Sequence, residues 1–432
     1  MPPWEGVRVI ERTGGLESGS VVVLQLRRGP FRRRWVACHH DVVPGVSFSD
    51  TMERGPFAAW THVHRFFDGP DGAGGLSDEV EYRLPLGLLG RPAGPFVHRA
   101  LQRAFTFRHR RLLNDLGRHR TTPGPLRVAV TGPSGLIGSA LCAFLTSGGH
   151  EVVRVTRTPR QAGDLRISQA GIVDDPGRLE GLDGVVHLAG ESIDKRWTRG
   201  RKHEIDRSRT EGTRALAETL ARLESPPRVL VSASAVGVYG DRGDELLTED
   251  SVPGSDFLAQ VCTGWEAATS PAGDAGVRVV TVRFGVVLEA LLRRMLLPFR
   301  LGLGGPVGRG SQWVSWVTLD DLLGAVLHAL TNESLAGPVN VVAPGATTNR
   351  ELARTLGAAL GRPARMRIPA FAARLLFGEL ADALLLASQH AAPVALTQSG
   401  FEFAYPRLDD ALHVLLGREE PEGPRALAST PA

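Results

Sequence analysis

Cysteine is scarce in this chain. Only Cys38, Cys142 and Cys262 occur in 432 residues, and they lie far apart in the sequence. Small secreted domains that are stabilised by disulfide bonds have many, closely spaced cysteines. The chain is therefore not a small disulfide-rich domain of that class. We expect a reducing compartment, and the cytoplasm is the simplest one.

Long apolar runs are also missing. The most apolar region, residues 371–396, is interrupted by Arg374, Glu379 and Asp382, whereas a membrane-spanning helix needs about 20 consecutive apolar residues. No secretion signal is expected ahead of Trp4. We therefore expect no membrane partner.

Lysine is nearly absent, because only Lys195 and Lys202 are lysines among 50 basic residues. The net charge of +4 is small and the basic residues are scattered, so no nucleic-acid partner is expected. Two explanations stay open for the lysines. They are either survivors of a bias toward arginine on a solvated helix, or flexible amines needed because lysine can donate a proton and arginine cannot.

The length predicts more than one domain, because a single hydrophobic core rarely serves a chain of this size. Short alternating segments before residue 85 predict an antiparallel sheet, and an apolar stripe from Val97 to Leu116 predicts a helix packed on it. We divide the chain into an α+β domain at 1–120, a linker at 121–126, a second domain at 127–288, a smaller lobe at 289–420 that returns some elements to the second domain, and a disordered tail at 421–432.

Strands and helices alternate from residue 127 onward, which predicts an α/β fold with a doubly wound parallel sheet. The pattern loosens after Val287, where a polar-poor segment with several glycines and prolines leads to a helix near residue 320. The expected strands are 127–131, 151–156, 184–189, 228–233 and 277–283, and the expected helices are 136–148, 205–223, 257–269, 320–330 and 349–360.

Three glycines follow the first of these strands. Gly132, Gly135 and Gly138 are spaced as in a dinucleotide-binding turn, where they permit a tight turn, close approach of a pyrophosphate and packing of helix on strand. The amides that open the following helix would face the phosphates. Arg157 ends the second strand, where an acidic residue would select NAD(H), so we predict NADP(H) with NAD(H) less favoured. We therefore expect a Rossmann NADP-binding domain at 127–288 and a substrate lobe with returning Rossmann elements at 289–420.

The motifs at 187–190 and 231–240 make the chain similar to the extended short-chain dehydrogenase/reductases. Segments 190–198, 299–306 and 316–321 narrow the resemblance to atypical members of the epimerase family, sometimes labelled cell-division inhibitors, over about residues 127–417. Residues 78–87 and 107–110 resemble a START-like, polyketide-cyclase-like domain of helix-grip fold, here shortened at its amino-terminal end. The resemblance implies these cofactor-binding residues: Thr131, Gly132, Ser134, Gly135, Leu136, Ile137, Gly138, Arg157, Leu188, Ala189, Gly190 and Ser232.

The catalytic dyad usual in the superfamily is missing. Its tyrosine and lysine positions fall on Leu258 and Cys262, neither of which can act as the acid and base. Ser234 matches the hydroxyl that holds the substrate oxyanion, and Tyr239 and Lys195 are the candidate proton donors. Tyr239 could equally pack a turn, and Lys195 could be a solvated loop residue.

Two further groups have chemical potential and a plain alternative. Cys262 could be a nucleophile, but on an apolar helix face it is more often a buried small residue. His62 and His64 could share one strand face, and residues 38–41 read Cys-His-His-Asp. Their spacing matches no established ligand pattern, so we predict no metal.

Two functions compete. The first is an NADP(H)-dependent oxidoreductase or epimerase that acts by hydride transfer on a small polar substrate, a nucleotide-linked sugar by analogy with the family. The second is a non-catalytic NADP(H)-binding sensor with a START-like domain for an apolar ligand or a partner. A monomer or a homodimer fits either one.

Overall fold

The computed structural model describes residues 2, 4–28, 31–69 and 74–418, so the predicted tail at 421–432 lies outside the described residues. The described residues form two compact units, the first within residues 1–108 together with 417 and 418, and the second residues 109–416. The division falls inside a helix, α1 (Gly94–His119), rather than at the expected linker.

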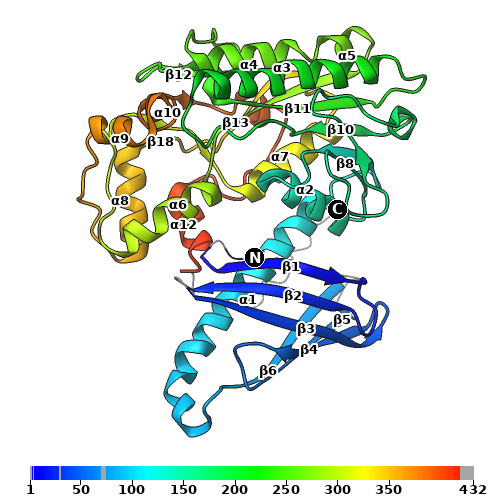
Figure 1. The fold of residues 1–432 in the computed structure, drawn as a ribbon, viewed down its shortest axis with the longest axis vertical. Coiled ribbons are helices and arrows are strands. Elements are labelled where there is room, and N and C mark those ends of the chain that lie inside the picture. The colour runs from blue at the N-terminus through cyan, green and yellow to red at the C-terminus, as the bar shows by residue number, and fades with distance from the viewer. Residues whose placement is uncertain (1, 3, 29–30, 70–73, 419–432) are drawn as a thin grey trace. The chain divides into compact units, whose positions relative to one another are not determined.

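The first unit is built on one antiparallel sheet whose six strands pair in chain order (Figure 1). The sheet and a following helix were expected from the alternating pattern, whereas the fourth strand was not, and the fifth was considered only because His62 and His64 could share a strand face. Their residues include Asp50, His62 and His64, polar side chains that break the apolar alternation. The strands are β1 (Gly6–Thr13), β2 (Val21–Arg28), β3 (Phe31–Val43), β4 (Ser47–Arg54), β5 (Ala59–Asp68) and β6 (Gly74–Arg83).

The second unit contains a seven-stranded sheet in the order β17-β13-β11-β10-β7-β8-β9, and every pairing in it is parallel. The order reverses between β7 and β10, and open α/β sheets bind ligands at such a point, beyond the carboxyl ends of the strands. The strands are β7 (Arg127–Thr131), β8 (Glu151–Thr156), β9 (Leu165–Arg166), β10 (Gly184–His187), β11 (Val229–Ala235), β13 (Arg278–Phe284) and β17 (Gly337–Val341).

Helices cover both faces of this sheet (Figure 1). Alternation along β7 sends Val128 and Val130 to a core shared with α2 (Leu136–Ser147) and α7 (Leu319–Thr331). Ala129 faces the opposite core, which includes α3 (Arg199–Ala221). Burial on both faces explains why these strands read as continuous apolar runs.

The region after Val287 contains more regular structure than the sequence indicated. α6 (Leu288–Arg300) occupies the start of the segment in which we expected no helix, with Pro298 in its last turn. α8 (Asn349–Leu360), α9 (Ala370–Phe377) and α12 (Leu408–Leu415) follow. The expected boundaries of α8 match those observed.

The carboxyl-terminal half of α1 belongs to the second unit and neutralises buried acidic groups there. Arg118 pairs with Asp321 at 2.6 Å and Arg111 with Asp320 at 3.0 Å, and both carboxylates are almost fully buried. Buried charges need such partners, because an unpaired one is costly.

Among the described residues, none of the helices has the length and apolar content required to cross a membrane.

Candidate cofactor and substrate site

The glycine turn, residues 131–138, joins β7 to α2 at the reversal of strand order. Gly132 has φ +68°, and a Cβ on it would lie 3.0 Å from the Leu188 carbonyl. A Cβ on Gly138 would lie 2.2 Å from the Gly132 oxygen. Side chains are therefore excluded at both positions, and the backbone of the turn stays bare.

Thr131 holds the turn against the end of β10. Its buried hydroxyl accepts hydrogen bonds from the amides of Leu188 and Ala189, at 3.1 and 3.2 Å, and lies 2.8 Å from Nδ1 of His187. Burial lowers the pKa of His187 to about 4, so its ring is neutral at neutral pH, and its Nδ1 can accept a hydrogen bond from the Thr131 hydroxyl. The predicted residues Leu188 and Ala189 thus lie directly beside the glycine turn.

The amino-terminal end of α2 is left open. Its N-cap is Gly135, which offers no side chain to accept the first amides, and no acidic residue lies in the first turn. Ser134 and Gly135 are exposed, while Leu136 and Ile137 are half-buried. Bare amides at a helix amino terminus bind phosphate, so this turn fits the pyrophosphate of a dinucleotide.

Arg157 follows β8 and is exposed, with its guanidinium 3.4 Å from Glu191. Arg201 also pairs with Glu191, at 3.1 Å, and Arg209 donates to the Glu191 carbonyl at 3.0 Å. Burial would raise the pKa of Glu191, but the hydrogen bonds and charges of Arg201 and Arg157 lower it. Three guanidiniums therefore lie beside Gly190, in a place suited to an additional phosphate.

Two of the catalytic candidates lie in one hydrogen-bonded chain of side chains, which we call the hydroxyl network: Ser234, Glu266, Arg283, Tyr239 and Asn340. Ser234 donates to Glu266 at 2.6 Å, and Arg283 forms two bonds of 2.9 Å to the same carboxylate. Arg283 also donates to the Tyr239 hydroxyl at 2.9 Å, which donates to Asn340 at 2.7 Å. Both hydroxyls are occupied by protein partners.

Burial and hydrogen bonding act in opposite directions on the pKa of two groups in this network. Burial would lower the pKa of Arg283, but the hydrogen bonds and charge of Glu266 raise it. Burial raises the pKa of Tyr239, although Arg283 acts in the opposite direction. Tyr239 has no exposed surface and Ser234 is 2% exposed. The catalytic roles of Ser234 and Tyr239 stay predictions. In this structure both hydroxyls are hydrogen-bonded to other side chains of the protein.

The positions of the missing dyad lie on α4 (Phe257–Ala267) and are filled by core residues. Leu258 packs with Trp197 and Val261. Cys262 is 3% exposed, and burial raises the pKa of its thiol to about 12, so it is protonated at neutral pH and cannot act as a thiolate nucleophile. The three cysteines are all free and buried.

The remaining predicted residues lie apart from the network. Lys195 is exposed in the loop after β10, while Lys202 pairs with Glu379 at 2.5 Å and lies over the ring of Phe257. The Ser232 hydroxyl on β11 is buried and has no hydrogen-bond partner among the described residues. Ser232 therefore has an unused donor.

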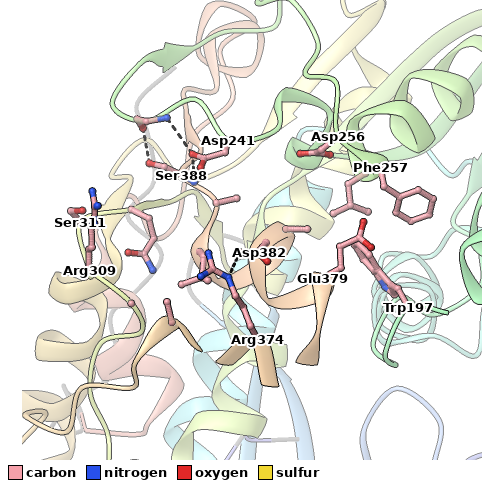
Figure 2. A pocket seen from close by; sticks show the side chains of 18 of the residues that line it. Trp197, Asp241, Asp256, Phe257, Arg309, Ser311, Arg374, Glu379, Asp382 and Ser388 are labelled. Carbon is pink, nitrogen blue, oxygen red and sulfur yellow. Dashed lines mark hydrogen bonds and ion pairs between the residues drawn. The ribbon is translucent and has the colours of Figure 1, made fainter. Parts of the chain in front are cut away.

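A cavity of about 720 Å³ lies between the loops after β11 and the segment 308–388 (Figure 2). It borders the start of α4, and its lining includes none of the predicted cofactor residues and none of the catalytic candidates Ser234, Tyr239 and Lys195. Among the described residues its lining includes five carboxylates, two guanidiniums and two aromatic rings: Asp241, Asp244, Asp256, Glu379, Asp382, Arg309, Arg374, Trp197 and Phe257.

Residues 128–343 match the NAD dependent epimerase/dehydratase family, and residues 368–415 match a domain of unknown function, DUF1731. The epimerase family protein Mb2239 of Mycobacterium bovis is 40% identical over 290 residues, which are 66% of this chain and 96% of the relative. The chain belongs to the NAD-dependent epimerase/dehydratase family.

Two solved structures are similar to this one. A nucleoside-diphosphate sugar epimerase from Corynebacterium glutamicum is 35% identical with a TM-score of 0.77, and the match covers 97% of this chain and 84% of that one. The human epimerase family protein SDR39U1, solved with NADPH, is 38% identical with a TM-score of 0.62, over 66% of this chain and 98% of that one. The expected Rossmann-like fold and epimerase family are confirmed.

Sequence reasoning missed several polar residues of the site. Glu191 stands within a motif used for the resemblance, but its pairing with Arg157 depends on a contact across 34 residues. Arg283 offered a signal, since it is the one charged residue inside the apolar strand segment 279–284. A buried arginine requires a carboxylate, and that requirement would have directed attention to Glu266.

Proposed function

We propose that the protein is an NADP(H)-binding oxidoreductase or epimerase that acts by hydride transfer on a small, hydroxyl-rich substrate of the sugar class. The observation that carries the proposal is the glycine turn, whose bare backbone and uncapped α2 amides suit a dinucleotide pyrophosphate. Membership of a family described as NAD dependent supports it.

The preference for NADP(H) rests on Arg157 and the two guanidiniums behind it. A 2'-phosphate would replace part of the contact between Arg157 and Glu191, and Arg201 would keep that carboxylate neutralised. The human relative was solved with NADPH, which supports the same preference.

The substrate class rests on the cavity. Trp197 and Phe257 offer apolar surface. The carboxylates around them can accept hydrogen bonds from hydroxyl groups, and the amide groups can both accept and donate such bonds. A diphosphate would find a less favourable lining, because carboxylates outnumber guanidiniums and Arg374 is already paired with Asp382 at 2.9 Å. Arg309 at the cavity would have to meet that charge. Similarity to the Corynebacterium nucleoside-diphosphate sugar epimerase supports a nucleotide-linked sugar.

When bound, the nicotinamide would supply or accept the hydride. The chain's own part is to hold the dinucleotide on the glycine turn and to keep the turn against β10 through Thr131. We retain Ser234 as the candidate oxyanion donor and Tyr239 or Lys195 as candidate proton donors. For Ser234 or Tyr239 to act, the hydroxyl network would have to release one hydrogen bond, which costs about 1 kcal/mol.

A second function is favoured by one specific observation. Both network hydroxyls are occupied by protein groups, and the dyad positions hold Leu258 and Cys262. A non-catalytic NADP(H) sensor needs only the glycine turn, so it is consistent with a network that serves rigidity alone.

One experiment separates the two functions. Purified full-length protein is titrated with NADPH and NADH by calorimetry, and is then incubated with NADPH and a panel of carbonyl compounds while cofactor oxidation is followed. Nucleotide sugars are incubated in parallel and examined by NMR, because an epimerase returns the hydride and leaves no net oxidation. Uptake of NADPH with turnover of a sugar supports the enzyme. Uptake without any turnover supports the sensor, and no uptake of either cofactor refutes both.

We also propose that the first unit is a START-like domain. The six-stranded antiparallel sheet followed by the long helix α1 supports this. Binding of a fluorescent fatty acid to the full chain, competed by unlabelled lipid, tests whether it accepts an apolar ligand.

A further inference from the structure

Four ionisable side chains gather on one face of the first unit's sheet, which we call the imidazole cluster: Asp50, His62, His64 and Asp78. His62 and His64 alternate on β5 and so project to the same face. Asp50 on β4 is the register partner of His62, and Asp78 on β6 is the register partner of His64. Strand pairing therefore brings two carboxylates to two imidazoles from both sides.

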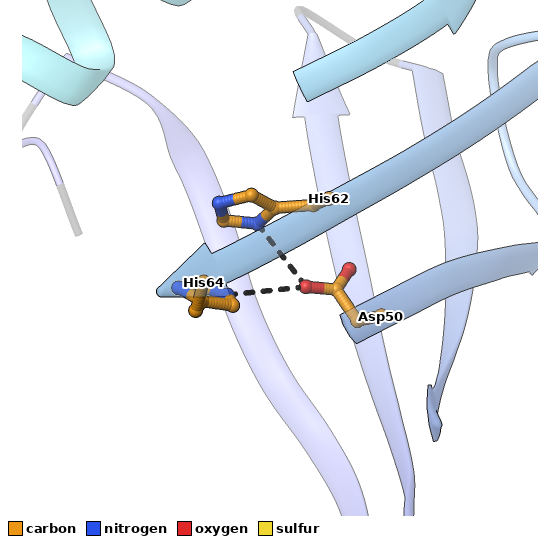
Figure 3. A group of neighbouring side chains, drawn as sticks. All are labelled: Asp50, His62 and His64. Carbon is orange, nitrogen blue, oxygen red and sulfur yellow. Dashed lines mark hydrogen bonds and ion pairs between the residues drawn. The ribbon is translucent and has the colours of Figure 1, made fainter. Parts of the chain in front are cut away.

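Every ring nitrogen of the cluster faces a carboxylate oxygen. Oδ1 of Asp78 lies 3.1 Å from Nε2 of His62 and 2.7 Å from Nδ1 of His64. On the other side, Oδ2 of Asp50 lies 3.1 Å from Nδ1 of His62 and 3.4 Å from Nε2 of His64 (Figure 3).

Two neutral imidazole rings have fewer N–H groups than the cluster has nitrogen–oxygen contacts. A neutral imidazole carries one N–H, so two neutral rings supply two protons for four nitrogen–oxygen pairs. The tautomers with Nε2–H on His62 and Nδ1–H on His64 send both protons to Asp78. The two remaining nitrogen lone pairs then converge on a single oxygen of Asp50. In this pair of tautomers the three lone pairs leave room for a cation between them, whereas the opposite tautomer of either ring would place an N–H against Asp50.

One proton on either ring can supply such a charge, a proton on each ring would fill all four contacts, and one metal ion is the alternative that binds the three lone pairs together. Double protonation would make both rings cationic although their centroids lie only 3.8 Å apart, which places two like charges in contact. A single divalent ion binds all three lone pairs at once. Tetrahedral zinc with bonds of about 2.0–2.1 Å separates its ligand atoms by about 3.3 Å, close to the observed 3.1 and 3.4 Å.

We propose that Asp50, His62 and His64 bind one divalent transition-metal ion of the zinc class, and that Asp78 fixes both imidazoles in the ligating tautomer. A carboxylate that accepts the second N–H of a ligating histidine is the common outer partner in protein metal sites. Two histidines and one carboxylate leave a further coordination position open, as in catalytic rather than structural zinc sites.

The surroundings hold the rings in place. Phe48 stacks on His64, with centroids 4.0 Å apart and planes 14° from parallel, and Phe105 meets His62 edge-on at 5.2 Å. The side chains of His62, His64 and Asp78 are at most 8% exposed, whereas Asp50 is 16% exposed. The more exposed Asp50 marks the side from which an ion and a water ligand would enter.

The sequence alone does not reveal which carboxylates lie beside these histidines. The ligating atoms of Asp50, His62 and His64 lie within 4.8 Å of one another, and among the described residues no other group of this kind is found. His40 of the Cys-His-His-Asp segment instead bonds Thr51, at 2.6 Å. The ligands come from paired strands, so no short spacing in the sequence reveals them.

The test uses the full-length protein, freed of metal by a chelator near neutral pH. Zn²⁺ is added by calorimetry, and Co²⁺ is added while the visible absorption of the tetrahedral ion is followed. We expect one ion per chain. His64→Asn and Asp50→Asn should weaken binding at least a hundredfold, and Asp78→Asn roughly ten- to a hundredfold as an outer partner. His40→Asn is the matched control and should bind as the unaltered protein does.

A second measurement needs no variant and so does not depend on how the substitutions fold. Nitrogen-15 labelled histidine in the unaltered protein reports the tautomers by NMR, and with zinc we expect Nε2–H on His62 and Nδ1–H on His64. The proposal is overturned if the unaltered protein takes up neither ion. It is also overturned if folded His64→Asn and Asp50→Asn bind normally, or if both rings stay doubly protonated at saturating zinc.

Discussion

The glycine turn and the hydroxyl network lie at the carboxyl ends of strands in the same sheet, yet they treat polar groups in opposite ways. At the turn, the α2 amides meet no capping side chain. In the network, Ser234, Arg283 and Tyr239 all bond to other protein groups inside the core. The glycine turn therefore leaves backbone amides available to bind a ligand, whereas the side chains of the hydroxyl network bond to one another and connect the strands with helix α4.

The largest effect is expected from removing the central charge of the network. Arg283→Met leaves the half-buried Glu266 carboxylate, 17% exposed, without its guanidinium, and because breaking a fully buried pair costs roughly 3–5 kcal/mol, we expect a loss of about 3 kcal/mol. Hydrogen exchange of the β11 and β13 amides measures the loss, because it reports opening of this sheet.

Arg278→Met is the matched control on the same strand. Arg278 donates to the backbone carbonyls of Ala329 and Leu335 and leaves no carboxylate behind. Equal losses in the two variants would show that the network does not depend on its ion pair.

A new carboxylate at the glycine turn should leave the fold stable but weaken cofactor binding. Gly135→Asp places a good N-cap residue at the start of α2, so helix stability should be kept or slightly improved. The same carboxylate would occupy the amides and repel the pyrophosphate, so NADPH affinity should fall roughly ten- to a hundredfold by calorimetry.

Gly177→Asp, on an exposed turn, makes the same chemical change elsewhere and should leave NADPH affinity intact. Undiminished affinity in Gly135→Asp would mean that the cofactor phosphates do not lie on α2.

A smaller effect should reveal which cofactor the turn prefers. Arg157→Asp should weaken NADPH roughly tenfold and NADH less, because only NADPH has the 2'-phosphate that a guanidinium can bind. Arg166→Asp replaces another exposed, ion-paired arginine near the same sheet edge and should change neither affinity. Equal weakening of both cofactors by Arg157→Asp would contradict the assignment.

The smallest effect compares two serines on β11. Ser234→Ala removes a donor to Glu266 and should cost about 1 kcal/mol by hydrogen exchange, with NADPH affinity nearly unchanged. Ser232→Ala removes a buried hydroxyl that lacks a partner among the described residues, so it should cost nothing or stabilise the sheet. Weaker NADPH binding in Ser232→Ala would instead identify this hydroxyl as a cofactor contact.

The backbone of the site was predictable, but its side-chain pairings were not. Gly132 and Gly138 followed from their spacing after an apolar strand, and the structure shows why neither position tolerates a Cβ. The boundaries of the five expected strands were close because both faces of the sheet are buried and the apolar runs are clear, whereas β9 and β17 were not expected and α3 begins at Arg199 rather than at residue 205. The partners of Ser234 and Tyr239 come from distant elements, so only the tertiary fold brings them together. The polar strand containing His62 lacks the apolar alternation on which strand prediction depends.

The division of α1 between the two units affects how the protein can be cut for expression. A fragment beginning at the Thr121–Pro125 junction would omit Arg111 and Arg118 and leave the carboxylates of Asp320 and Asp321 buried without their cations. Truncation at residue 109 keeps both arginines. A cut at the expected linker, residues 121–126, therefore removes the cations that the second unit needs. A cut inside α1, at residue 109, keeps them.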